Sequence, residues 1–156
     1  KGALEAAKIE LEKQLRSEMD QGNLTVGSNE RGLVVTVLNR ILFAPGLAEL
    51  KDSSKATLGK VADVLKQPTG SHMVYIEGHT DSDPIQKSSW KSNWELSAAR
   101  ALEVVHFLVD EKGLTPQQVA ASGYGEFQPV ESNATADGKM KNRRVEIVIS
   151  PRKLVA

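Results

Sequence analysis

The spacing of hydrophobic and polar residues predicts four strands along the chain. Runs rich in β-branched residues at 33–38, 74–79 and 145–149 are typical of strands, and a shorter run at 119–123 gives a fourth. Residues 24–26 could add a short piece that pairs with 33–38 as a hairpin. Because helical patterns separate the middle strands while the first and last look like paired neighbours, we expect a mixed sheet.

Hydrophobic residues at three- and four-residue steps predict three helices. Two cover about 54–66 and 93–110, and the second begins at a capping box with Ser92 as the N-cap and Glu95 at the third helical position. The third helix, over 3–20, carries only a narrow apolar stripe. The expected fold class is α+β: a small mixed four-stranded sheet with the two main helices on one face, plus the N-terminal amphipathic helix.

The N-terminal helix divides the chain into two expected parts, a linker helix at 1–22 and a domain at 23–156. Gly22 and Asn23 are typical residues to end the helix. Its narrow stripe is compatible with a docking strut, with half of a helical pair formed with another subunit, or with a helix that packs on its own domain.

Composition excludes several classes of function. Twenty basic and 20 acidic residues give a formal net charge of zero, so binding to nucleic acid through phosphate neutralisation is not expected. Cysteine is absent, which excludes disulfides, thiol catalysis and thiolate metal sites. No apolar run approaches the ~20 residues that span a bilayer. Since the first residue is Lys1, we expect a fragment whose targeting or membrane segment lies outside it.

Asp81 and Arg100 are the leading candidates for a binding site. Asp81 directly follows the strand at 74–79, at the sheet edge where ligands of open α/β sheets bind. Helical spacing places Asn93, either Leu96 or Ser97, and Arg100 along one stripe of the next helix. An arginine in this alanine-rich segment should be partly enclosed, and an enclosed charge needs a partner.

Two interpretations of these opposite charges remain open. Asp81 and Arg100 could form an internal salt bridge. Alternatively, they stand apart and bind a ligand that carries both an ammonium and a carboxylate group, since a guanidinium grips a carboxylate by two parallel hydrogen bonds and an aspartate accepts from an ammonium. The residue types alone slightly favour the salt bridge.

Other polar residues add weaker predictions. His79 and Asp81 lie two apart at a strand end, but neither of the other two histidines has a spacing that brings a third ligand near, so we predict no metal site and no cofactor. No serine lies in a Gly-x-Ser-x-Gly turn, which argues against a catalytic serine. Asn142-Arg143-Arg144 leads into the last strand, where successive side chains point to opposite faces. One of the two arginines should therefore point toward the sheet edge at which Asp81 lies, and we favour Arg144.

Five separated blocks of sequence occur over roughly residues 33–150. They are Gly78-His-Thr-Asp81, Asn93-x-x-Leu-Ser97-x-x-Arg100-Ala101, Gly123-x-Gly125-Glu-x-x-Pro129, Asn133 and Asn142-Arg-Arg-Val145-Glu. In this order they resemble the OmpA-like peptidoglycan-binding domain, and together they are far more specific than any one block. Within the family the resemblance is greatest to the MotB branch, because the loop after Asp81 is long, contains Asp-Pro-Ile and ends in Ser-Asn-Trp-Glu-Leu-Ser.

The resemblance implies a non-catalytic peptidoglycan site. Carried over position by position, it implies that Asp81 takes the free amine of the diaminopimelate residue in the stem peptide and that Arg100 takes the adjacent carboxylate. This implication favours the ligand clamp over the internal salt bridge. The other residues implied to line the same groove are Thr80, Asn93, Leu96 and Arg144.

The same resemblance implies a role as a periplasmic anchor that attaches a membrane complex, in the MotB branch a flagellar motor stator, to the cell wall. The implied partners are peptidoglycan, a second copy in a homodimer and a membrane subunit of the stator. The alternatives are a general OmpA-type or lipoprotein anchor and, less favoured, a cell-wall hydrolase using His79 and Asp81. Two positions depart from the family pattern: Leu47 replaces a small polar residue, and Lys139 replaces an arginine.

Overall fold

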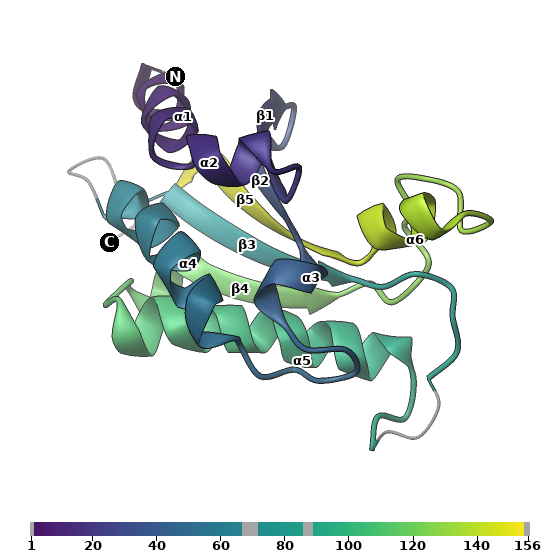
Figure 1. The fold of residues 1–156 in the computed structure, drawn as a ribbon. Coiled ribbons are helices and arrows are strands. Elements are labelled where there is room, and N and C mark those ends of the chain that lie inside the picture. Colours follow the sequence, from purple (N-terminus) through teal and green to yellow (C-terminus); the bar gives the residue numbers. More distant parts are fainter. Residues whose placement is uncertain (1, 67–71, 86–88, 155–156) are drawn as a thin grey trace.

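The chain folds around a five-stranded sheet in the computed structural model, which describes residues 2–66, 72–85 and 89–154 (Figure 1). The strand order is β1-β2-β5-β3-β4, with β3 and β4 parallel and the other neighbours antiparallel. The α+β class and the mixed sheet are therefore confirmed. The strands are β1 Leu24–Asn29, β2 Gly32–Leu38, β3 His72–His79, β4 Val119–Gly123 and β5 Arg144–Lys153.

The predicted count of four strands is wrong, because 24–29 form a full edge strand rather than a short extra piece. β1 pairs with β2 along its whole length. Gly32 closes the hairpin with a φ of 128°, where a Cβ would collide with the carbonyl oxygen of Ile149. The second half of β1, Gly27-Ser-Asn29, has no hydrophobic alternation, so the sequence pattern indicates only the first residues of this strand.

Two long helices, α4 and α5, cover one face of the sheet, as predicted (Figure 1). Ser92 is the N-cap of α5, as predicted, since its hydroxyl accepts from the Trp94 N–H at 3.1 Å and donates to the Glu95 side chain. The short helices α3 and α6 were not predicted, because fewer than two or three turns give no clear 3.6-residue period. These helices are α3 Asn39–Leu42, α4 Asp52–Leu65, α5 Asn93–His106, which continues as a π-helical turn at Phe107–Glu111, and α6 Ala136–Asn142.

The N-terminal helix is divided at Leu15 into α1, Gly2–Gln14, and α2, Arg16–Asp20. Leu11 and Leu15 are fully buried and belong to the main hydrophobic core, and α1 contacts α4 and β1 (Figure 1). Of the three interpretations of this helix, the structure shows the one in which it packs on its own domain. The division into a linker helix and a domain at residue 22 stays a prediction.

The close approach of α5 to the sheet determines the geometry at the end of β3. Gly78 in β3 lies under α5, where a Cβ would collide with the carbonyl oxygen of Ser97. Gly123 in β4 lies under the same helix, and a Cβ there would be 2.6 Å from the Ala98 nitrogen. Because both positions lack a side chain, the start of α5 lies directly beside the residues that follow β3.

Candidate ligand-binding site

A cavity of about 300 Å³ lies where the end of β3, the start of α5 and the loop after α3 meet. Its volume is at the lower end of the range for sites that bind small molecules or the end of a longer ligand. Five of the six residues predicted to bind a ligand line it, so the structure brings together groups that come from separate elements. They are Thr80, Asp81, Asn93, Leu96 and Arg100.

Main-chain hydrogen bonds fix the path of the chain as it leaves β3. The Tyr124 N–H donates to the Gly78 carbonyl at 3.0 Å, and the Thr80 N–H donates to the Gly125 carbonyl at 2.9 Å. These bonds extend the parallel pairing of β3 and β4 past the last strand residues. The Gly125 N–H also donates to the Ser97 hydroxyl at 3.0 Å, which ties this loop to α5. The residues after β3 are therefore bonded to the loop after β4, and that loop is bonded to α5.

Asp81 is buried, and its carboxylate already has two partners. Oδ2 forms an ion pair with Nη1 of Arg143, and Oδ1 accepts from the Asp83 N–H at 3.0 Å. The Thr80 hydroxyl donates to the Asp81 carbonyl at 2.8 Å and fixes the main chain here. The Arg143 side chain is 42% exposed, so its guanidinium can leave the carboxylate for solvent without opening a hole in the core.

Arg100 is equally buried, but its partners are of another kind. Its Nε donates to the Leu47 carbonyl at 2.8 Å, and its guanidinium carbon lies 5.0 Å from the centre of the Phe43 ring. Burial and the charge of Arg143 lower the pKa of Arg100 to about 10, while Asp81 acts in the opposite direction. The group therefore remains a cation at neutral pH.

The internal salt bridge between Asp81 and Arg100 is not formed, because Asp81 pairs with Arg143 instead. Among the described residues, no carboxylate oxygen lies within 4.0 Å of the Arg100 guanidinium. Its hydrogen-bond acceptors are the neutral carbonyls of Leu47 and Ala44, the latter at a long 3.5 Å. A buried guanidinium that lacks an anionic partner is electrostatically incomplete, so this cavity is suited to receive an anion.

Arg144, the sixth predicted residue, does not line the cavity, whereas Arg143 does. Arg144 is the first residue of β5 and is 3% exposed. Strand alternation places its side chain on the same face as Glu146, to which its Nε donates at 2.6 Å. Arg143 precedes the strand and turns toward Asp81. Arg143 thus lines the cavity in place of Arg144, and a role of Arg144 in ligand binding stays a prediction.

The two positions that depart from the family pattern contribute in ways their side chains do not indicate. Leu47 offers Arg100 its main-chain carbonyl, while its own side chain is largely exposed. The nature of that side chain therefore matters little for holding Arg100. Lys139 Nζ lies 3.0 Å from Oδ1 of Asp83, so it connects α6 to the loop after β3.

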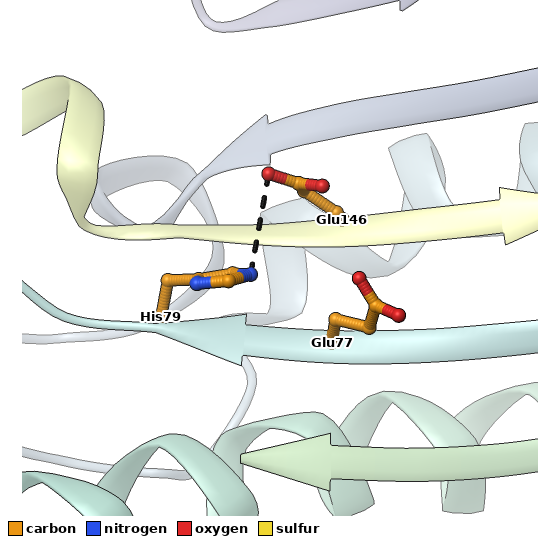
Figure 2. A group of neighbouring side chains, drawn as sticks. All are labelled: Glu77, His79 and Glu146. Carbon is orange, nitrogen blue, oxygen red and sulfur yellow. Dashed lines mark ion pairs between the residues drawn. The ribbon is translucent and has the colours of Figure 1, made fainter. Parts of the chain in front are cut away.

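A second polar cluster lies on the sheet face opposite α5 (Figure 2). Glu77 and His79 project from β3 and Glu146 from β5, and one possible ligand atom of each lies within 4.8 Å of the others. Sequence reasoning missed this group because Glu146 joins it only through strand pairing. His79 stacks on Tyr124 with ring centres 5.0 Å apart, and its ring nitrogens have no hydrogen-bond partner among the described residues.

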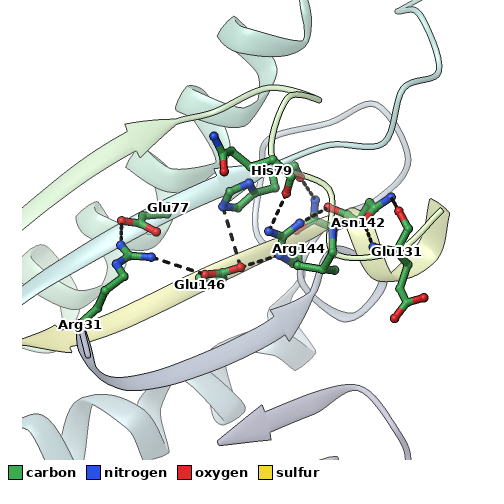
Figure 3. A network of polar contacts seen from close by, with 10 residues as sticks. Arg31, Glu77, His79, Glu131, Asn142, Arg144 and Glu146 are labelled. Atoms are coloured by element: carbon green, nitrogen blue, oxygen red, sulfur yellow. Dashed lines mark hydrogen bonds and ion pairs between the residues drawn. The ribbon is translucent and has the colours of Figure 1, made fainter. Parts of the chain in front are cut away.

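Two arginines already balance the carboxylates of this cluster (Figure 3). Glu77 and Glu146 lie directly opposite each other on paired strands, and they pair with Arg31 and Arg144 respectively. Burial and the charge of Arg144 lower the pKa of His79 to about 4, against the opposing effect of Glu146, so the imidazole is neutral at pH 7. Two carboxylates, two guanidiniums and a neutral ring make the cluster complete in charge. We therefore assign it a structural role.

This network continues into the loop before β5 (Figure 3). Arg144 Nη2 donates to the Gln128 carbonyl at 2.9 Å. The side chain of Asn142 is fully buried, where it accepts from the Glu131 N–H at 3.0 Å and donates to the Glu131 carbonyl at 2.9 Å. Two residues of the Asn-Arg-Arg block thus hold the loop in place, and Arg143 alone of the three lines the cavity.

The sequence pattern of the OmpA family matches residues 42–143, a span that contains all five predicted residues that line the cavity. The chain belongs to the OmpA family. Motility protein B of Bacillus subtilis (strain 168) is 35% identical to this OmpA-family chain over 149 residues. The match covers 96% of this chain and 57% of that protein, so the chain spans little more than half of the relative's length.

Two solved structures share this OmpA-family fold closely. A putative MotB-like protein from Desulfovibrio vulgaris superimposes with a TM-score of 0.86 at 27% identity, covering 97% of this chain and 96% of that one. The cell wall anchor of the T6SS from Pseudomonas aeruginosa gives a TM-score of 0.80 at 34% identity, covering 90% and 96%. The resemblance to the OmpA-like domain and to its MotB branch is confirmed. Within the described residues, no helix has both the length and the apolar character needed to cross a bilayer.

Proposed function

We propose that the cavity binds the diaminopimelate residue of the peptidoglycan stem peptide without catalysing a reaction. Arg100 receives the side-chain carboxylate of this residue, and Asp81 receives the adjacent ammonium. The observation that carries the proposal is the buried cation of Arg100, which lines a cavity beside Asp81 and has no carboxylate partner among the described residues. A ligand that carries both a carboxylate and an ammonium group can pair with Arg100 and Asp81 at the same time.

The contacts already made by Arg100 determine how a carboxylate would bind. Its Nε is engaged with the Leu47 carbonyl at 2.8 Å, whereas Nη2 makes only a long contact of 3.5 Å to Ala44. The two Nη groups are therefore the donors left for a carboxylate, and together they form the fork that grips it bidentately. Lysine at this position could not provide that geometry.

Asp81 would exchange one cation for another. In the absence of ligand it pairs with the half-exposed Arg143, and the ligand ammonium takes the place of that guanidinium. The Asp83 N–H continues to hold Oδ1, so the carboxylate stays in position during the exchange. Binding then costs little rearrangement of the buried residues.

In this proposal the chain acts from the periplasm as the wall-attachment part of a flagellar motor stator. It does so as a homodimer that is joined to a membrane partner subunit. The likeness to Motility protein B of Bacillus subtilis over 96% of the chain supports this role. Modest affinity per site is sufficient, because the cell wall repeats the same stem peptide and two linked sites bind more tightly than one.

A wall anchor for a system other than motility is a second candidate. The cell wall anchor of the T6SS is 34% identical, which is higher than the 27% of the MotB-like structure. The same ligand and the same two charged residues would serve either system. Deleting the encoding gene and recording swimming in soft agar separates them: loss of swimming with flagella still assembled supports the stator, and normal swimming supports the other anchor.

Calorimetry with two tripeptides tests the ligand. One contains diaminopimelate and the other contains lysine, which lacks the side-chain carboxylate. We expect the wild type to bind the first peptide at least about tenfold more tightly, since a bidentate carboxylate contact is lost with the second. Arg100→Ala should remove this preference, and Asp81→Ala should weaken both peptides. Arg152→Ala, an exposed arginine at the far end of β5, is the control.

The proposal is wrong if Arg100→Ala keeps the preference for diaminopimelate. Incubation of labelled sacculi with the wild type addresses the hydrolase alternative in the same preparation. We expect the protein to sediment with the sacculi and to release no soluble muropeptides. Release of muropeptides that is lost in an Asp81→Ala variant would favour the enzyme instead.

A further inference from the structure

Trp94 and Phe127 form an exposed aromatic pair beside the cavity. Their ring centres lie 4.7 Å apart with the planes tilted by 34°, and the two residues are 54% and 57% exposed. The chain has only three Phe, two Trp and two Tyr, so two of its few aromatic rings stand together in solvent. Large rings are normally buried, and adjacent exposed rings mark a surface that binds something.

The main chain around Trp94 is fixed and leaves room for its indole ring. The Trp94 N–H donates to the Ser92 hydroxyl at 3.1 Å in the cap of α5. Gly125 has a φ of 64°, and a Cβ at this position would lie 3.2 Å from Cδ1 of Trp94. The absence of a side chain at Gly125 thus leaves room for the indole beside the loop that carries Phe127. A surface that is organised before binding loses little entropy when a ligand arrives.

A hydrogen bond connects the pair to the cavity. Asn93 lines the cavity, and its Nδ2 donates to Oε1 of Glu126 at 3.1 Å. Trp94 is the residue after Asn93 and Phe127 is the residue after Glu126. Consecutive Cα atoms are about 3.8 Å apart, so the Cα atom of each aromatic residue lies next to that of a residue in this hydrogen bond. The aromatic pair and the cavity are therefore neighbouring parts of one surface.

We infer that Trp94 and Phe127 form a subsite for the glycan strand of peptidoglycan, an inference that rests on the proposed stem-peptide site. A pyranose ring has a face of C–H groups, and the negative face of an aromatic ring attracts them. In the stem peptide two residues separate diaminopimelate from the sugar, a distance of about 10 Å in an extended chain. A sugar can thus lie on the aromatic pair while its own stem peptide enters the cavity.

The polar groups between the two sites fit the same ligand. Asn93 and Glu126 provide an amide and a carboxylate at the junction, where the hydroxyl and acetamido groups of an amino sugar would lie. A purely apolar partner, such as a hydrophobic patch on a second copy, would cover this bonded polar pair without adding a hydrogen bond to it, whereas sugar hydroxyls can both donate and accept there. The junction therefore favours a carbohydrate as the occupant.

Two binding measurements on the same preparations test the inference. One is sedimentation with peptide-free glycan strands, prepared by amidase digestion of sacculi, and the other is calorimetry with the diaminopimelate tripeptide. We expect Trp94→Ala and Phe127→Ala each to weaken glycan binding by about tenfold while tripeptide binding stays unchanged. Trp94→Phe should retain most of the glycan binding. Leu102→Ala removes a hydrophobic residue on the same helix that is 47% exposed, and it is the control.

The outcomes separate this inference from the proposed function. If the wild type binds the tripeptide and Trp94→Ala sediments with glycan strands as the wild type does, the inference is overturned and the stem-peptide site stands. If glycan binding depends on Trp94 and no tripeptide binding occurs, the aromatic subsite stands and the proposed cavity ligand is wrong. If analytical ultracentrifugation shows that Trp94→Ala abolishes a dimer without changing glycan binding, the pair is a self-association surface and the inference is overturned.

Discussion

Two groups of buried charges flank the end of β3, and they differ in how completely their members are paired. On one face of the sheet, Glu77 and Glu146 each pair with an arginine, and the neutral His79 lies beside them. At the cavity, Asp81 also has an arginine partner, but the buried Arg100 has only carbonyls and a ring. The same residue types thus form a closed structural network in one place and an incompletely paired group, which we call the open group, in the other. The number of satisfied charges separates them.

Adjacent residues of the chain belong to different groups. Arg144 belongs to the closed network and Arg143 lines the cavity, although the two are neighbours in sequence. On β3, His79 faces the network, and two residues later Asp81 contributes to the cavity because the chain has left the strand. Where a strand ends therefore decides the role of a charged residue, as much as its type does.

The largest expected effect comes from opening the closed network. Arg144→Ala removes the nearer partner of the half-buried Glu146, which keeps the 3.9 Å contact with Arg31, and it removes the donor to the Gln128 carbonyl. We expect the free energy of unfolding to fall by about 3–5 kcal/mol. Urea unfolding measures it, with the exposed Arg152→Ala as the control. A loss below about 1 kcal/mol would contradict the structural role.

The next effect is a pH dependence of stability that originates at His79. Its pKa of about 4 in the folded chain lies below the ordinary 6.5, because of burial and the nearby Arg144. Between these values the unfolded chain binds a proton that the folded chain does not, so stability falls as the pH decreases. We expect this contribution to reach about 2 kcal/mol between pH 7 and pH 5. Urea unfolding at both pH values should show a smaller fall for His79→Gln than for the wild type.

His106 provides the comparison for that measurement. It lies on α5 with its side chain 66% exposed, so folding removes little of this side chain from solvent. We expect His106→Gln to keep the full pH dependence of the wild type. An equal reduction in both variants would mean that the effect does not come from the closed network.

A smaller effect is expected when the open group is changed. Arg100→Ala removes a buried cation that has no carboxylate to leave unpaired, and Asp81 keeps Arg143. Only the carbonyl of Leu47 loses a good donor, so we expect the free energy of unfolding to fall by about 1 kcal/mol. Urea unfolding beside Arg144→Ala gives the contrast directly. If the two variants lose equal stability, the distinction between a closed and an open group fails.

The smallest effect should come from Arg143. Arg143 pairs with Asp81, so in the proposed site Arg143→Ala removes a competitor for the ligand ammonium. We expect the diaminopimelate tripeptide to bind about threefold more tightly, a gain of roughly 0.6 kcal/mol, which calorimetry resolves. Weaker binding in this variant would show that Arg143 contributes to the ligand site instead of competing for it.

The spacing of residues along the chain predicted those parts of the fold that depend on interactions between sequence neighbours. The N-cap at Ser92 and the helix that follows depend on neighbours within four residues, and both are present. Spacing placed Asn93 and Arg100 on one helical stripe with Leu96 or Ser97, and the family resemblance chose Leu96, which lines the cavity. Thr80 and Asp81 followed from the end of a strand with clear alternation. These predictions needed no knowledge of distant residues.

Features that depend on long-range pairing could not be predicted in the same way. The β1 edge strand owes its length to pairing with β2, since half of it lacks hydrophobic alternation. Arg144 takes its direction from the register of β5 against β3, which begins at the His79↔Arg144 pair. One residue of shift in that register would have exchanged the two arginines. The partner of Asp81 was therefore beyond the reach of local spacing.

Gly78 has a consequence for the tolerance of the binding site to mutation. The helix above it rests on the main chain with no space for a methyl group. Because a helix shifts as a rigid rod, widening that contact would carry Asn93 and Arg100 away from Asp81 together. The distance between Asp81 and Arg100 thus depends on the contact between Gly78 and α5, which lies outside the cavity. Substitutions at Gly78 would therefore weaken ligand binding at the proposed site, although no residue that lines the cavity is replaced.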